Sequence, residues 1–127
     1  MSDSTRTNIP GTSPYEPIIG FSRAVRIGNH VHVSGTGPVG ADGSDVTHQT
    51  EQCLTLIAIA LKNAGSSIDH VYRTRMYLTH PQDWEKVGHV HGKFFSLIRP
   101  AATMVVVAQL LDPCWRIEIE ADAYIPG

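Results

Sequence analysis

The amino-acid sequence predicts an α+β fold with the element order strand-strand-helix-strand-helix-strand-strand. Three observations lead to this prediction. Several segments alternate apolar and polar residues, two longer segments repeat apolar residues every three or four positions, and glycine or proline separates the segments. The chain has 127 residues, of which 42% are hydrophobic, and this suits one core rather than two. We therefore expect a single domain over residues 1–127.

The chain begins with a segment that has no periodic pattern. Residues 1–17 are rich in Ser, Thr, Pro and Gly, and we interpret them as a loose N-terminal arm. Apolar and polar residues then alternate over residues 21–27 and again over residues 30–34, with Gly28-Asn29 between the two runs. Two alternating runs around a break that contains glycine predict a β-hairpin.

Two later segments have helical spacing, and an alternating segment lies between them. Apolar residues recur at helical intervals over residues 46–64, and Gly65 fits the C-terminal end of that helix. Residues 70–79 alternate and predict a third strand, with Tyr72, Thr74, Met76 and Leu78 on one side and Val71, Arg73, Arg75 and Tyr77 on the other. Pro81 fits the first turn of a second helix, which residues 99–100 end. The apolar stripe of this helix consists of Trp84, Val87, His91, Phe94, Phe95 and Ile98.

Two strands are expected to finish the chain. Residues 104–108 are continuously apolar, so we expect this strand to be covered on both faces. Residues 115–124 alternate, and one side of the strand carries Arg116, Glu118, Glu120, Asp122 and Tyr124. Two helices can cover only one face of the sheet. The other face would be exposed in a lone domain, which predicts a partner chain, most simply another copy.

Charge and composition exclude several classes of protein. The net charge is −2, from 10 basic and 12 acidic side chains, and this argues against a general nucleic-acid binder. No apolar run approaches the ~18–20 residues of a membrane span, and no signal-peptide core follows the polar start. Cys53 and Cys114 cannot form a disulfide framework or a four-thiolate zinc site. We expect a cytoplasmic protein with reduced thiols and no membrane partner.

Residues 35–40 match the G-x-G-x-x-G pattern of dinucleotide-binding loops and follow a predicted strand. Such a loop must open a helix whose amide groups bind a pyrophosphate. Here Pro38 removes one amide, the loop continues to residue 45, and no strand-helix-strand unit surrounds it. We therefore predict no cofactor, although the loop still offers backbone donors to a ligand.

Histidine and cysteine could in principle form a metal site or a nucleophile. His30 and His32 share one face of a strand and could chelate a metal, but no third ligand has a fixed relation to them. In the second His-Val-His segment, His91 lies in the apolar stripe and is expected to be a hydrogen-bonded core residue. Cys53 and Cys114 have no nearby histidine and are expected to be inert. We predict no metal.

The carboxylates Glu118, Glu120 and Asp122, called the acidic row below, lie on one side of the last predicted strand. Adjacent like charges repel each other, so their clustering needs a reason. One interpretation is a set of salt bridges at a subunit interface with Arg116, or with Arg73 and Arg75 of another strand. The other is that one carboxylate transfers protons in a cleft. Spacing alone leaves both open.

Three short segments resemble the RidA/YjgF family, which also carries the older names L-PSP endoribonuclease and translation-inhibitor protein. They are Ser34-Gly35 at the end of the second strand, residues 99–101 (RPA), and residues 117–121 (IEIEA). The resemblance covers about residues 18–125. It implies a chorismate-mutase-like fold with a mostly antiparallel sheet, two helices on one face, and a homotrimer with ligand sites in the clefts between subunits.

The resemblance also implies an activity. Members of the RidA type hydrolyse reactive enamines and imines such as 2-aminoacrylate, and they release ammonia and a keto acid. In those members a glutamate positions a water molecule, and it corresponds to Glu118 in this chain. By the same resemblance, the substrate-binding positions of this chain are Phe21, Ser34, Gly35, Gly88, Ala102, Thr103 and Met104.

This chain departs from the family pattern at several of these positions. The arginine that grips the substrate carboxylate is replaced by Ala102, the family cysteine by Met104, a tyrosine by Phe21 and an asparagine by Gly88. Alanine carries no charge and no donor, so the bidentate clamp on a carboxylate is absent. The chain therefore resembles a divergent branch of the family with a more apolar pocket.

Two functions remain open at this point. The first is a hydrolase of a small enamine, imine or related compound without a carboxylate, in which Glu118 is the acid/base and acts through a water also held by the Ser34 or Gly35 amide. The alternative is a non-catalytic trimer that binds a small molecule or regulates. Ribonuclease action needs a basic path with stacking aromatics, and the acidic row argues against it.

The sequence leaves the position of a replacement cation open as well. Arg23, Arg75 and Arg99 are the arginines that could enter the cleft in place of the missing side chain, from the same or a neighbouring chain.

Overall fold

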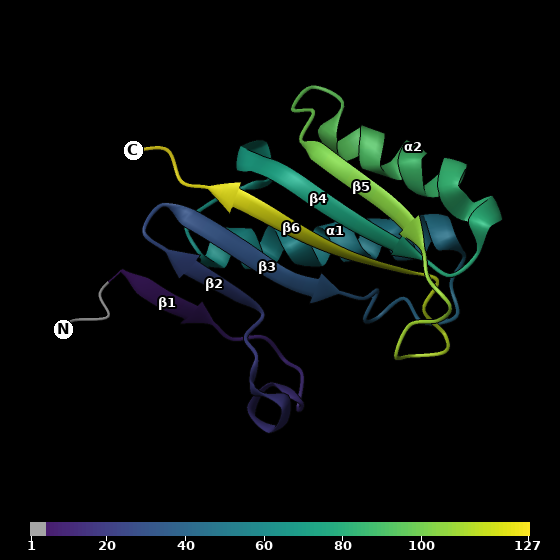
Figure 1. Ribbon diagram of the computed structural model, residues 1–127, viewed down its shortest axis with the longest axis horizontal. Coiled ribbons are helices and arrows are strands. Elements are labelled where there is room, and N and C mark those ends of the chain that lie inside the picture. Colours follow the sequence, from purple (N-terminus) through teal and green to yellow (C-terminus); the bar gives the residue numbers. More distant parts are fainter. Residues whose placement is uncertain (1–4) are drawn as a thin grey trace.

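The computed structural model describes residues 5–127, which form one six-stranded sheet with two main helices. The strand order is β1-β2-β3-β6-β4-β5, and every neighbouring pair is antiparallel except β4 and β5, which run parallel. Figure 1 shows α1 behind the sheet and α2 beyond β5. The bounds are β1 Arg6–Ile9, β2 Ala24–Ile27, β3 His30–Thr36, α1 Val46–Asn63, β4 Val71–Leu78, α2 Trp84–Phe95, β5 Ala101–Val106 and β6 Ile117–Tyr124. The predicted α+β class is confirmed.

The prediction of a loose N-terminal arm over residues 1–17 is wrong for part of this segment. Arg6–Ile9 forms β1, which pairs with β2, and the Ile9 side chain is buried in the core. A short π-helical turn at Glu16–Gly20 follows it. Four residues with a single buried side chain are too few to show an alternating pattern, because β1 is held by backbone pairing at the sheet edge. Residues 1–4 of the expected arm lie outside the described residues.

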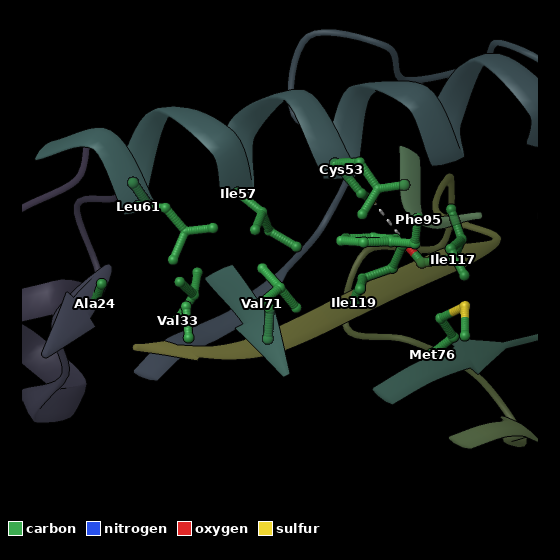
Figure 2. Close-up of a cluster of buried hydrophobic side chains, with 14 of the residues drawn as sticks. Ala24, Val33, Cys53, Ile57, Leu61, Val71, Met76, Phe95, Ile117 and Ile119 are labelled. Atoms are coloured by element: carbon green, nitrogen blue, oxygen red, sulfur yellow. Dashed lines mark hydrogen bonds between the residues drawn. The ribbon is translucent and has the colours of Figure 1, made fainter. Parts of the chain in front are cut away.

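Helix α1 forms where its spacing predicts it. The Asp45 side chain caps its first turn by accepting a hydrogen bond from the His48 amide at 2.9 Å. The chain leaves the helix through Ala64 and Gly65, whose φ of +92° favours glycine. Figure 2 shows the Leu61, Ile57 and Cys53 side chains directed toward the sheet. They and the buried sheet residues form one continuous apolar core.

The sheet alternates as predicted except where a bulge interrupts it. A register shift between Val71 and Arg73 places Val71 with the buried side chains, at 2% exposure, while Tyr72 is 39% exposed. The predicted alternation placed these two residues on the opposite faces, so it is wrong at this end of β4. From Arg73 onward the prediction is confirmed, with Thr74, Met76 and Leu78 buried.

Helix α2 begins after a 3-10 turn, Pro81–Asp83, and packs on the same face of the sheet as α1. Its buried side chains are Val87, Val90 and Phe95. Asp83, just before the helix, is buried as well, whereas Trp84 is not. Trp84 is 58% exposed, so its place in the predicted stripe is wrong, although its spacing of three residues from Val87 fits the stripe. It is the first residue of α2, at the end of the helix.

Strand β5 differs from the expected buried strand. It starts at Ala101, occupies the edge of the sheet, and leaves Val105 and Val106 42% and 49% exposed. The prediction that this strand is covered on both faces is therefore wrong for the single chain. Among residues 5–127, β5 is an edge strand whose one neighbouring strand is β4. The second face of the sheet, opposite the helices, is called the open face below. Within residues 5–127 no helix is long and apolar enough to cross a membrane.

Candidate functional site

The acidic row lies on the open face, because the alternate residues of β6 are buried under the helices. Two of its three carboxylates are paired. Arg75 contacts Glu120 Oε1 at 3.3 Å and Asp122 Oδ2 at 3.4 Å, and the Tyr77 hydroxyl donates to Glu120 at 2.9 Å. His32 contacts Asp122 at 2.9 Å. Salt bridging therefore accounts for Glu120 and Asp122.

Arg116 does not take part in this pairing, although its place in the alternation made it a candidate. Its guanidinium donates to both Asp83 oxygens, at 2.9 and 3.1 Å, at the start of α2. Asp83 is buried, so a paired cation there offsets the cost of removing its charge from water. The position just before β6 lets the Arg116 side chain turn away from the row.

Glu118 is the third carboxylate of the acidic row, and these contacts do not include it. Among residues 5–127 it forms no ion pair and no side-chain hydrogen bond. Burial raises the pKa of Glu118, and the charge of Glu120 raises it further, while the charge of Arg23 opposes the change. A partly exposed carboxyl group with a raised pKa suits proton transfer.

Gly35 makes room for this carboxylate. A Cβ atom at position 35 would overlap Glu118 Oε2, so any larger residue would displace the carboxyl group. A register shift between Val33 and Thr36 marks the same place in the β3–β6 pair. The G-x-G-x-x-G segment thus begins inside a strand, and no helix follows it until Val46.

Ser34 and Gly35, two of the predicted site residues, lie on β3, which pairs with the strand that carries Glu118. The Ser34 hydroxyl donates to Ser22 O at 2.7 Å, and the Ser34 amide donates to Arg23 O at 3.0 Å. Both donors of Ser34 are therefore engaged, and the expectation that its amide could hold a water is wrong. Phe21 ends the π-helical turn through a hydrogen bond from its amide to Glu16 O at 3.0 Å.

The remaining predicted residues lie at the other edge of the sheet. Ala102 and Met104 pair with Thr74 and Met76, so they belong to the helix side of β5. The Met104 Cε atom would lie 3.9 Å from a Cβ atom at Gly88 of α2. Thr103 pairs with Arg75 and therefore faces the opposite way, toward the open face.

Within one chain, these residues do not form one site. The group around Glu118 and the group around Met104 lie on opposite faces of the sheet, and β4 lies between β6 and β5 (Figure 1). Two hollows of about 440 and 390 Å³ lie elsewhere, the larger beside Trp115 and the smaller beside Pro100. Neither is lined by any of the predicted site residues.

The other candidate groups have structural partners. His91 Nε2 lies 2.9 Å from Thr74 Oγ1, and burial lowers the pKa of His91, which confirms the hydrogen-bonded core histidine. Burial raises the pKa of the Cys53 thiol, whose sulfur lies 3.9 Å from Ile117 O. His30 packs edge-on against Tyr72. The described residues hold no cluster of three or more possible metal ligands.

Sequence reasoning missed two neighbours of the site. Tyr77 donates to the acidic row, and the alternation of β4 against β6 was the signal that could have placed it there. Glu16 accepts two hydrogen bonds from the Gly11 amide, at 3.0 and 3.1 Å, and its charge acts on Arg23. No periodic pattern pointed to this contact, because it depends on the irregular chain between β1 and β2.

Comparison with known proteins gives consistent matches along nearly the whole chain. The family model described as Endoribonuclease L-PSP matches residues 11–125. The chain is 32% identical over 121 residues to the 3-aminoacrylate deaminase RutC of Acinetobacter baylyi, covering 91% of this chain and 93% of that one. It is 31% identical over 114 residues to a RutC family protein of Pyrococcus abyssi, covering 86% and 89%.

A solved structure is also similar. The crystal structure of Rv2704 from Mycobacterium tuberculosis, described as a member of the YjgF/YER057c/UK114 family, has 45% sequence identity to this chain. It superimposes with a TM-score of 0.89, and the match covers 94% of this chain and 99% of that one. The fold and the sequence therefore agree on the same relatives.

The raised pKa of Glu118 has a consequence for stability. The folded protein holds this proton more tightly than the unfolded chain, whose carboxyl titrates near 4.5. The stability from protonated Glu118 is therefore fully present below that pH and is lost as the pH rises through the folded-state pKa. We expect the free energy of unfolding of the wild type, minus that of Glu118→Gln, to fall over this range in urea titrations.

The matched control is Glu85→Gln, which removes an exposed carboxylate from α2. If the difference in free energy of unfolding between the wild type and Glu118→Gln stays level or rises with pH, that result would contradict the burial of Glu118.

Proposed function

The chain belongs to the RidA/YjgF family, whose model is described as endoribonuclease L-PSP, and we propose that it is a homotrimer that hydrolyses a small C–N compound. The ligand would be an enamine, an imine or a related metabolite bound in a cleft between subunits. Glu118 would be the catalytic residue. The single observation that supports this most strongly is that Glu118 is partly buried, has a raised pKa and forms no ion pair within residues 5–127, while its two neighbours in the acidic row are paired.

The chemistry follows from what a carboxyl group can do beside a C=N bond. An enamine first becomes an imine when its β-carbon takes up a proton. Water then adds to the imine carbon, Glu118 accepts a proton from that water, and the nitrogen is protonated. When the C–N bond breaks, ammonia leaves and a carbonyl product remains. A carboxyl group with a raised pKa can both give and take a proton at a higher pH than a free carboxyl group can.

A second chain is needed to complete the site. Ser34, Gly35 and Glu118 lie on β3 and β6 on one side of the sheet, whereas Gly88, Ala102 and Met104 lie at the far edge on the other side. The open face of one copy set against the β5 edge of another would bring the two groups together. The exposed Val105 and Val106 side chains on that edge support such a contact.

The carboxylate clamp of the family is absent from the second group. Ala102 has no donor, and Met104 and Gly88 beside it are uncharged. A 2-imino acid would therefore bring its carboxylate toward position 102 without the guanidinium that holds it there in the family. The alternative function, a small-molecule-binding trimer without catalysis, is favoured by this same replacement and by the engaged amide of Ser34.

The test of catalysis uses a panel of imines generated from simple amines by an amine oxidase, with ammonia release as the readout. We expect wild-type turnover above the uncatalysed rate, and a loss of about 10²–10⁴-fold in Glu118→Gln, because that variant cannot exchange a proton with water. Glu85→Gln, an exposed carboxylate on α2, should keep the wild-type rate. Binding of ligands without turnover in the wild type would favour the non-catalytic alternative.

A second prediction concerns position 102. We expect hydrolysis of 2-aminoacrylate to be about 10- to 100-fold slower than in an arginine-bearing relative, since a hydrogen bond to a charged group is worth about 1.5–3 kcal/mol. Ala102→Arg should restore part of the rate, because Phe21, Gly88 and Met104 also differ. Keto-acid release measures both. A wild-type rate equal to that of the relative would show that position 102 does not decide this activity.

The third prediction concerns assembly. Sedimentation equilibrium of the wild type should give the mass of a trimer at micromolar concentration, and Val106→Asp should shift it toward monomer by burying an unpaired charge at the contact. Ile59→Asp is the matched control, because Ile59 is also exposed but lies on α1, away from the sheet. A stable monomer in the wild type would overturn the proposed trimer.

A further inference from the structure

Arg23 lies beside Glu118 on the open face and is not used by the proposed mechanism. Its backbone carbonyl accepts a hydrogen bond from the Ser34 amide at 3.0 Å, so it stands opposite Ser34 just before β2. Its guanidinium Nη2 donates to Gly35 O at 2.6 Å, next to the place where Gly35 contacts the Glu118 carboxylate. The same glycine therefore separates the cation from the candidate acid/base.

The guanidinium has donors to spare. Within residues 5–127 the bond to Gly35 O is the only side-chain hydrogen bond of Arg23, and it forms no ion pair there. Its Nε atom is inaccessible to water and has no hydrogen-bond partner. A ligand cannot reach an atom that water does not reach, so an anion would meet the Nη donors instead, of which the bond to Gly35 O engages only one N–H of Nη2.

Neighbouring acidic groups act on Arg23 without neutralising it. Burial lowers the pKa of Arg23, and the charges of Glu16 and Glu118 oppose that effect. The Glu16 carboxylate is held by the Gly11 amide, through two hydrogen bonds of 3.0 and 3.1 Å, rather than by the guanidinium. Arg23 thus keeps its charge and presents it on the face that carries Glu118.

The other two candidate arginines are already occupied or lie elsewhere. Arg75 contacts Glu120 and Asp122. Arg99 donates to Ser96 O at 3.1 Å from an exposed turn with a φ of 56°. Of the three, Arg23 alone combines spare donors with a place beside Glu118.

We propose that Arg23 is the anion-binding residue of this site, so that the ligand carries a small planar anion such as a carboxylate. This inference rests on the proposed function, because it takes the ligand to bind where Glu118 acts. Guanidinium donors match the two oxygens of a carboxylate, and the match gives both affinity and orientation. The anion would be held by the subunit that supplies Glu118.

The expected weakness toward 2-imino acids is compatible with this assignment. In those substrates the carboxylate is bonded directly to the carbon that water attacks. Moving the carboxylate from the position-102 side of the cleft to Arg23 therefore moves the reacting carbon with it. A carboxylate-bearing ligand with a different spacing between anion and C–N group fits the Arg23 side instead.

The test compares two probes on the intact protein by titration calorimetry: pyruvate, and its uncharged analogue pyruvamide. They report on anion binding alone and not on where a reacting carbon would lie. We expect the wild type to bind pyruvate at least tenfold more tightly than pyruvamide, and Arg23→Gln to lose that preference. Arg23→Lys should retain an intermediate preference, because it keeps the charge without the planar fork. Arg99→Gln, which removes the same charge elsewhere, should bind both probes like the wild type.

A purely structural Arg23 would lower the melting temperature of Arg23→Gln while leaving its ratio of the two affinities unchanged, and this result would overturn the proposal. No wild-type preference for pyruvate, or no binding of pyruvate, would overturn it as well, even where Arg23→Gln fails to fold. These readouts need no turnover. Their failure is therefore distinct from failure of the proposed hydrolysis, which depends on ammonia release and Glu118.

Discussion

The structure depends on one constraint: both helices cover the same face of the sheet, so the charged face of β6 and β4 has no layer of its own. Apolar residues of every central strand are drawn to the helix side. The acidic row must then lie on the open face, where Arg75 pairs with Glu120 and Asp122 and His32 contacts Asp122. In the described part of the chain, Glu118 is left as a partly buried carboxylate without an ion-pair partner.

The close approach of Gly35 to Glu118 fixes where the carboxyl group of Glu118 can lie. Only a residue without a side chain leaves room for the carboxyl group at that point of β3. Burial against the strand raises the pKa of Glu118, and Arg23, bonded to the carbonyl of the same glycine, limits the rise. Backbone geometry, local burial and charge thus act together on the single carboxyl group that we propose as the acid/base.

Much of the fold could be predicted because it follows from local patterns. Helix α1, the β2–β3 hairpin and the alternation of β6 each follow from the spacing of apolar residues, and so does the open-face position of Glu118. What could not be predicted depends on contacts between distant residues. β1 is defined by pairing with β2, the bulge at Val71 by its partner strand, and the turn of Arg116 by buried Asp83.

The central claim is that the two groups of site residues, which lie on opposite faces of one chain, meet between chains. The direct measurement is an isotope-filtered nuclear Overhauser experiment on a mixture of chains, with methyl-labelled Met104 in one population and protonated Phe21 in an otherwise deuterated second population. Transfer between the Met104 methyl and the Phe21 ring of different chains is the result that the account predicts. An assembled protein that shows no such transfer would contradict it.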